Sequence, residues 1–294
     1  MIGYEAWRPE EAITSAGANG RGASTPASMT DASPLPVDGL TLEEAVGRAL
    51  ALLRSGRGGQ IVTLNPEIVM RARRDPGLRS VITRAALVTA DGMGIVWGAR
   101  LAGLTIPERV TGIDLSVALL ARTGALGYDA FLLGAARGVA ETAARAITAR
   151  LPGARIAGVW SGDPQPVSDA EAVARVRASG ARLLLVAYGA PMQEQWIARN
   201  LTALPGVVAI GVGGALDMIA GRAPRAPRWM RAAGLEWLYR LAREPGRWRR
   251  MLALPAFAAL AVRSGVRARL AGAPAMVTVR SAERPRQTGS SERI

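Results

Sequence analysis

Ala86-Leu87-Val88-Thr89-Ala90-Asp91-Gly92-Met93-Gly94 is an apolar, β-rich run that stops abruptly in an Asp-Gly-x-Gly turn. A helical pattern follows from Ile95, so the stretch predicts a buried strand, a tight turn and a helix. In an open α/β sheet, ligands bind beyond the carboxyl ends of the strands. We therefore expect Asp91 at a ligand site, with the glycines leaving room for a substrate. The alternative is that Asp91 only caps the next helix, since Asp is a preferred N-cap residue.

The composition narrows the chemistry that Asp91 could perform. The chain of 294 residues has no His and no Cys, and all 37 of its basic residues are Arg. The usual base near neutral pH is therefore absent, and thiol or Schiff-base catalysis is excluded. If the protein uses a general base, we expect a carboxylate. The lack of Cys also rules out disulfides and fits a reducing cytoplasm.

The net charge of +14 predicts an anionic partner, which could be nucleic acid, acidic lipid or a phosphorylated substrate. The first five residues lack the basic and apolar segments of a signal peptide. No uncharged apolar run approaches the roughly 18–20 residues needed to span a bilayer.

The pattern of predicted elements divides the chain into four parts. Residues 1–38 are rich in Gly, Ala, Ser, Thr and Pro without periodicity, which predicts a disordered leader. Residues 39–221 alternate strands and helices, which predicts an α/β catalytic core with a parallel sheet. Residues 222–271 are predicted to form a basic helical, membrane-associating appendage, and residues 272–294 a polar, disordered tail.

Local signals place the elements of the core. Residues 41–44 and 168–171 show the capping-box pattern, Thr or Ser followed three residues later by Glu. Asn65 before Pro66 predicts a cap residue with Pro at the first helical position. Strands are predicted at residues 60–64, 86–90, 129–133, 155–159, 182–187 and 207–212.

The segment from residue 222 to 270 has twelve Arg but only two acids, Glu236 and Glu244. Its Trp and Phe residues are Trp229, Trp237, Trp248 and Phe257. The apolar run Met251–Val262 is too short to span a membrane and contains Pro255, which should break it. A basic segment with Trp and an apolar face is typical of the surface of an anionic membrane. The alternative is an Arg-rich helical face packed on the sheet.

Glycines at three predicted strand ends could let backbone N–H groups approach a phosphate. They are Gly92 and Gly94, Gly134 and Gly138, and Gly211, Gly213 and Gly214. None completes a G-x-G-x-x-G motif and no Lys is available for a P-loop, so the loops fit a mononucleotide or sugar nucleotide better. They could equally be tight strand–helix turns. The chain contains no Asp-x-Asp motif, the pattern that would predict a metal site. Arg would therefore have to neutralise the charge of a diphosphate.

Several motifs occur in an order that is specific as a set. They are Thr63-Leu64-Asn65-Pro66-Glu67, Ala90-Asp91-Gly92-Met93-Gly94, Arg109-Val110-Thr111-Gly112, Gly189-Ala190-Pro191-Met192-Gln193-Glu194, Gly211-Val212-Gly213-Gly214-Ala215-Leu216-Asp217, Arg225-Ala226-Pro227-Arg228-Trp229 and Leu235-Glu236-Trp237-Leu238-Tyr239-Arg240-Leu241. From about residue 40 to 252 the chain resembles the WecG/TagA/CpsF family of bacterial glycosyltransferases. It departs from the family pattern at Met192, where Lys is usual, and at Leu216, where Phe is common.

This resemblance implies a Rossmann-like parallel-sheet core of the GT-E type with a basic helical C-terminal appendage. It also implies an inverting, metal-independent enzyme without a cofactor. The donor would be a UDP-sugar carrying a hexose or N-acetylhexosamine, and the acceptor a polyprenyl-diphosphate-linked sugar of cell-surface or exopolysaccharide biosynthesis. The protein would lie in the cytoplasm, peripherally on the inner face of the cell membrane. An anionic membrane is then an expected partner, nucleic acid is not, and a homo-oligomer is compatible with the sequence.

The resemblance also assigns roles to individual residues. Asp91 is similar to the family's general base, and Arg109 to a site arginine. The expected substrate-positioning residues are Thr63, Asn65 and Gln193. Asp217 and Gly213 beside it are similar to the nucleotide-contacting loop, and Gly134 and Gly189 are expected among the other substrate-binding residues. The arginines expected to reach the diphosphates are Arg240, Arg247 and Arg250.

Two other functions remain open on the sequence. A basic chain with aromatic residues could bind nucleic acid by backbone contacts and base stacking. That function gives no role to an acid at a strand end. A dinucleotide-binding enzyme of another Rossmann type is the second alternative.

Overall fold

The computed structural model describes residues 33–280, with the side chains of Arg228, Ala232 and Arg247 left out. Its core is a six-stranded sheet with the order β3-β2-β7-β6-β4-β5, in which all neighbours are parallel. The strands are β2 (Gly59–Leu64), β3 (Leu87–Ala90), β4 (Ala130–Gly134), β5 (Ile156–Trp160), β6 (Leu183–Ala187) and β7 (Val208–Gly211). The predicted α/β parallel-sheet class is confirmed.

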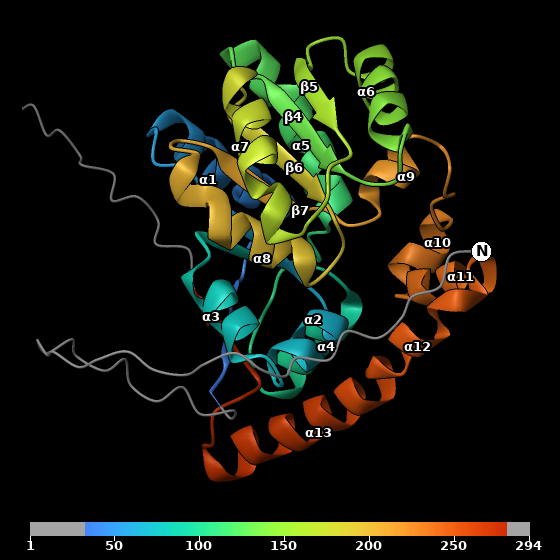
Figure 1. Cartoon of the computed structure of the whole chain (residues 1–294). Helices are drawn as coiled ribbons and strands as arrows, with labels where there is room; N and C mark the ends of the chain where they lie inside the picture. Colours follow the sequence, from blue (N-terminus) through green and yellow to red (C-terminus); the bar gives the residue numbers. More distant parts are fainter. Residues whose placement is uncertain (1–32, 281–294) are drawn as a thin grey trace, which may run out of the picture. The chain divides into compact units, whose positions relative to one another are not determined.

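Helices cover both faces of this sheet (Figure 1). One face packs against α1 (Leu42–Arg54), α5 (Gly112–Thr123), α6 (Val139–Arg150) and α9 (Ala215–Ile219). The other face packs against α2 (Pro66–Ala72), α3 (Pro76–Arg84), α7 (Asp169–Ala178) and α8 (Met192–Asn200). Successive residues such as Ile61 and Val62 enter opposite core layers, so both must be apolar.

The predicted helix starts are confirmed in two of three cases. Thr41 and Glu44 form both halves of a capping box at α1. Asn65 accepts a hydrogen bond from the Ile68 N–H at 3.0 Å and precedes Pro66 at the first helical position of α2. The second capping box is wrong, because Ser168 ends a short 3-10 turn in helical conformation and makes no side-chain cap bond. A capping side chain normally requires an extended backbone at that residue.

The predicted boundaries of the disordered ends are also wrong. Residues 35–38, assigned to the leader, and residues 277–280, assigned to the tail, form the parallel pair β1 (Leu35–Asp38) and β8 (Val277–Arg280). Asp38 is buried there; it accepts from the Val88 N–H at 2.7 Å and forms ion pairs with Arg48 and Arg280 at 3.3 and 2.6 Å. The rest of the predicted leader and tail, residues 1–32 and 281–294, lies outside the described residues.

After α9 the chain forms a succession of helices. They are α10 (Arg228–Ala232), α11 (Glu236–Arg243), α12 (Trp248–Met251) and α13 (Ala253–Ala271), with a 3-10 turn at Pro245–Arg247 before α12. The helix α13 packs against α2 and against α4 (Met93–Leu101), and Phe257 and Ala261 are buried in that contact (Figure 1). The contact fits the alternative of a packed helical face, although α13 covers α2 and α4 rather than the sheet itself.

Contrary to the prediction, Pro255 does not break the apolar run. It lies in the first turn of α13, where backbone N–H groups have no intrahelical partner and Pro is tolerated. Within residues 33–280, α12 and α13 together (Trp248–Ala271) form a helical stretch long and apolar enough to cross a membrane, and an 18-residue window of it has a mean hydropathy of 1.3. Length and composition do not distinguish a membrane span from a packed or interfacial helix.

We predict that Asp38 holds the β1–β8 pair to the core. Asp38→Ala removes the acceptor of a buried N–H and of two arginines, so the free energy of unfolding should fall by roughly 1–3 kcal/mol. Urea denaturation followed by circular dichroism measures this change. Glu43→Gln is the control, because its ion pair with Arg122 is exposed and such pairs contribute at most about 1 kcal/mol. Equal stabilities for the two variants would contradict the role given to Asp38.

Candidate functional site

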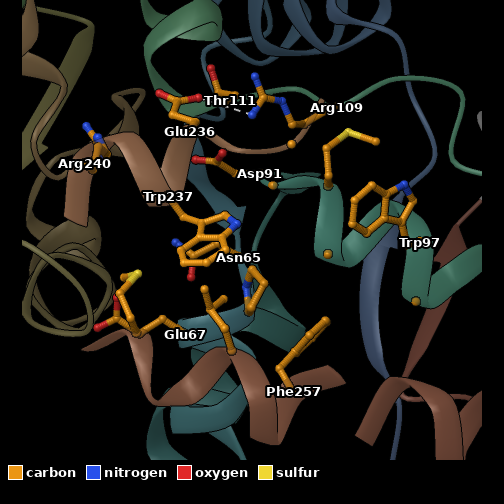
Figure 2. A pocket seen from close by; sticks show the side chains of 18 of the residues that line it. Asn65, Glu67, Asp91, Trp97, Arg109, Thr111, Glu236, Trp237, Arg240 and Phe257 are labelled. Carbon is orange, nitrogen blue, oxygen red and sulfur yellow. Dashed lines mark hydrogen bonds and ion pairs between the residues drawn. The ribbon is translucent and has the colours of Figure 1, made fainter. Parts of the chain in front are cut away.

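A cavity of about 440 Å³ opens at the carboxyl ends of β2, β3 and β7, where the appendage helices approach the core (Figure 2). Its polar lining comprises Asn65, Glu67, Asp91, Arg109, Thr111, Glu236 and Arg240. Its apolar lining includes Met93, Trp97, Trp237, Leu254, Phe257 and Val262. The volume is that of a small-molecule site.

Asp91 directly follows β3, and its backbone N–H still donates to the Leu64 carbonyl at 2.8 Å. Gly92 occupies the N-cap position of α4 with φ of 112°, a conformation that favours glycine, and no side chain caps this helix. The alternative role of Asp91 as a cap residue is therefore wrong. Its Oδ2 instead accepts a hydrogen bond from the Gly112 N–H at 3.4 Å.

The surroundings of Asp91 change its acidity. Burial raises the pKa of Asp91 to about 6, even though the Gly112 N–H and the charge of Arg109 act to lower it; Glu236 acts to raise it. A carboxyl group with this pKa is mostly ionised at neutral pH but is more basic than an exposed Asp. Those two properties suit a general base.

An ion pair holds the appendage beside this carboxylate. Arg109 Nη1 lies 3.2 Å from Glu236 Oε2, and each of the two side chains is 16% exposed. Glu236 is the first residue of α11, so the pair joins the loop before α5 to the appendage. In Figure 2 the pair lies next to Asp91, whose site it helps to enclose.

A second ion pair acts at the start of the appendage. Arg225 Nη2 lies 2.7 Å from Asp114 Oδ2, which also accepts from the Thr111 hydroxyl at 2.6 Å. Burial acts to raise the pKa of Asp114, but the hydrogen bonds from Arg225 and Thr111 outweigh it, and the pKa is lowered. The Arg225 charge thus stabilises the ionised Asp114 carboxylate in the first turn of α5, the helix that Thr111 caps.

The structure describes the side chains of two of the three arginines that were predicted to bind the diphosphates. Arg240 lines the cavity, and its Nη2 lies 3.2 Å from the Met218 sulfur. Arg250 Nε lies 3.0 Å from Glu67 Oε1, so it reaches the cavity edge through a carboxylate on α2. The side chain of Arg247 lies outside the described part of the chain.

With this geometry in view, comparison with known proteins gives a consistent result. The model of the glycosyl transferase WecG/TagA/CpsF family matches residues 31–271. The chain belongs to this family and is a glycosyltransferase. It is 35% identical over 208 residues to N-acetylglucosaminyldiphosphoundecaprenol N-acetyl-β-D-mannosaminyltransferase of Bacillus spizizenii, covering 70% of this chain and 79% of the relative. The Bacillus subtilis enzyme of the same name is 35% identical over 202 residues, covering 68% and 78%.

The structure divides the residues that the family resemblance singled out. Four of them line the cavity: Asn65, Asp91, Arg109 and Arg240. The others that the structure describes lie outside its lining: Thr63, Gly134, Gly189, Gln193, Gly213, Asp217 and Arg250. Thr63 is buried, and its hydroxyl donates to the Gly211 carbonyl at 3.4 Å.

Gln193 joins two loops at the carboxyl edge of the sheet. Its Oε1 accepts from the N–H groups of Gly189 at 3.1 Å and Gly213 at 2.9 Å, and its Nε2 donates to Glu194 at 2.8 Å. Gln193 is 3% exposed, so in this structure it positions the loops after β6 and β7. The buried Glu194 beside it does not line the cavity, and burial raises its pKa to about 7.

Sequence reasoning gave no role to Glu236, Glu67 or the apolar wall. A signal for Glu236 was present, since it is one of only two acids in the Arg-rich segment. Glu67 and the apolar wall depend on α13 folding back onto α2 and α4, which is a long-range contact.

We predict that Asp91 sets the acid limb of the pH–activity profile. The carboxylate must be ionised to accept a proton, so kcat/KM should fall as the pH drops through about 6. Arg109→Gln removes a charge that lowers the pKa of Asp91 and leaves Glu236 unpaired, so the limb should move to higher pH. Arg122→Gln, which removes the exposed partner of Glu43, is the control and should leave the limb in place. A limb that stays unmoved in Arg109→Gln would assign it to another group.

Proposed function

We propose that this glycosyltransferase moves an N-acetylhexosamine or hexose from a UDP-sugar to a polyprenyl-diphosphate-linked sugar, with inversion and with Asp91 as the base. The observation that carries the proposal is the position of Asp91. Its partly desolvated carboxylate lies at the carboxyl edge of the sheet, in a cavity that is also lined by arginine and apolar side chains. The printed names of the two Bacillus relatives describe transfer of an N-acetyl-β-D-mannosaminyl group to a diphosphoundecaprenol-linked sugar.

The proposed reaction is a single displacement. Asp91 takes the proton of an acceptor hydroxyl as that oxygen attacks the anomeric carbon of the donor. A bond forms between the acceptor oxygen and the anomeric carbon, while the bond from that carbon to the donor phosphate oxygen breaks. The electron pair of the broken bond leaves with UDP, and the configuration at the anomeric carbon inverts.

The leaving UDP gains negative charge, which the site must stabilise. Arg240 lines the cavity and presents a guanidinium group suited to bidentate phosphate contacts. Preorganised charges of this kind favour the transition state because they need no reorganisation as the reaction proceeds. Arg240 is therefore our candidate for the donor diphosphate, and Arg250 for a second phosphate once it exchanges Glu67 for the ligand.

We also propose that the protein works peripherally on the inner face of the cell membrane, where a lipid-linked acceptor would reside. Support comes from the outer face of the appendage, where Trp229 and Trp248 are 66% and 53% exposed. Leu252 and Leu270 of the α13 region are 61% and 84% exposed. Exposed Trp and Leu beside many arginines suit the interface of an anionic leaflet.

For the reaction, we expect Asp91→Asn to reduce turnover by roughly 10²–10⁴-fold, because the amide keeps the shape of the side chain but cannot accept the proton. UDP release is measured with UDP-N-acetylmannosamine, a panel of other nucleotide sugars and a short-chain lipid-linked N-acetylglucosamine acceptor. The melting temperature should not fall, since burying a neutral amide costs less than burying a charge.

Asp163→Asn changes an exposed carboxylate remote from the cavity and is the matched control, with turnover expected to equal that of the wild type. Near-normal turnover in Asp91→Asn would rule out its role as the base. Release of a nucleotide other than UDP would overturn the donor assignment.

For the membrane, we expect the triple change of Leu252, Val266 and Leu270 to Ser to weaken flotation with anionic liposomes at physiological salt. These three exposed side chains recur on one side of the helix, and their burial in the interface is insensitive to salt. The control variant changes Val117, Leu126 and Val167, which are exposed apolar residues on the surface of the α/β core, to Ser. Failure of the wild type to float, or equal loss in both triples, would contradict the membrane proposal.

A further inference from the structure

The reaction at Asp91 does not account for the apolar arm of the cavity. Sugars, nucleotides and diphosphates are polar, yet one arm is lined by α4 and α13 with side chains that include Met93, Trp97, Leu101, Leu254, Ala258 and Val262. An apolar wall of this kind implies an apolar part of a ligand.

The two helices that form the arm approach closely along small residues. A Cβ atom at Gly94 would lie 3.2 Å from Phe257 Cε1, and one at Gly98 would lie 3.4 Å from Ala261 Cβ and would collide with Met276. Further along, a Cβ at Gly265 would come within 2.9 Å of the Leu101 backbone. The helices therefore meet along this seam, and Gly94, Gly98 and Ala261 line the cavity together with the larger residues beside them.

The arm also runs from the reacting carboxylate to the exposed apolar face of the protein. Trp97, Leu101 and Val262 line it and are 50%, 44% and 52% exposed, so its outer rim is apolar and accessible. In Figure 2, Arg240 and Trp97 point to opposite sides of Asp91. A donor diphosphate at Arg240 would thus leave the Trp97 side free for the acceptor.

We infer that this arm binds the isoprene units nearest the diphosphate of the acceptor's lipid carrier, an assignment that rests on the proposed function. A lipid-linked sugar diphosphate presents a hydroxyl, then anionic charge, then an apolar chain. The cavity presents Asp91 with Arg109 beside it and then the α4–α13 wall, whose rim is continuous with the apolar outer face of α13. Its volume of about 440 Å³ admits only the first part of a long prenyl chain, so the remainder stays in the bilayer.

The test is direct binding of farnesyl diphosphate, with inorganic diphosphate as the reference, by isothermal titration calorimetry of the full chain without membranes. The wild type should bind farnesyl diphosphate at least about tenfold more tightly than diphosphate. Ala258→Phe fills the arm from an exposed position and should remove that difference while leaving diphosphate binding unchanged. Ala259→Phe adds the same ring at the next exposed residue, which points about 100° away and does not line the cavity, and should bind as the wild type does.

Equal binding of the two probes by the wild type, or equal loss in the two Phe variants, would overturn the inference. Because this assay involves no sugar transfer, it separates the inference from the proposed function. Selective farnesyl diphosphate binding without transfer from any nucleotide sugar would support the arm and refute the reaction. Transfer that depends on Asp91, without a contribution of the farnesyl chain to binding, would support the reaction and refute the arm.

Discussion

The site depends on a carboxylate that is held away from water without being neutralised. Asp91 has lost enough hydration for its pKa to rise to about 6, but the Gly112 N–H and Arg109 retain the ionised form near neutral pH. If the opposing charge were stronger, the carboxylate would be a weaker base; if it were absent, the pKa of Asp91 would be higher and less of the group would be ionised at neutral pH. In a chain without His, this balance would let Asp91 act as the base that we propose, a function that an imidazole often performs.

The pKa of Asp91 depends on residues of both the core and the appendage. The core contributes the strand end that positions Asp91 and the N–H group that contacts it, while α11 contributes Glu236 and Arg240. Two ion pairs, Arg109–Glu236 and Arg225–Asp114, connect these parts of the chain. A change in the position of the appendage would therefore alter the hydration and the charge at Asp91, and with them its basicity. Arginine suits such partly buried pairs because its fork of donors matches a carboxylate.

Much of the core could be predicted from local sequence. Continuous apolar runs such as 183–187 indicated strands with both faces covered, and Asp91 after such a run indicated the carboxyl edge of the sheet. The β1–β8 pair could not be predicted, because four-residue strands carry little periodicity and their partners are more than 200 residues apart, as in the Arg280–Asp38 contact. The course of α13 was equally hidden, since Pro255 reads as a helix breaker unless the helix is known to start at Ala253. Gln193 and Thr63 were recognised by family resemblance, but only the structure shows that their polar atoms hold backbone loops together.

If Asp91 is the base, proton transfer to Asp91 accompanies sugar transfer. This coupling is tested most directly by comparing the pH dependence of single-turnover transfer in the wild type and in Asp91→Asn. We expect an acid limb near pH 6 in the wild type and slow residual transfer without that limb in Asp91→Asn. A limb that persists in Asp91→Asn would contradict the account and would assign the titration to another group, such as the buried Glu194 with its pKa of about 7.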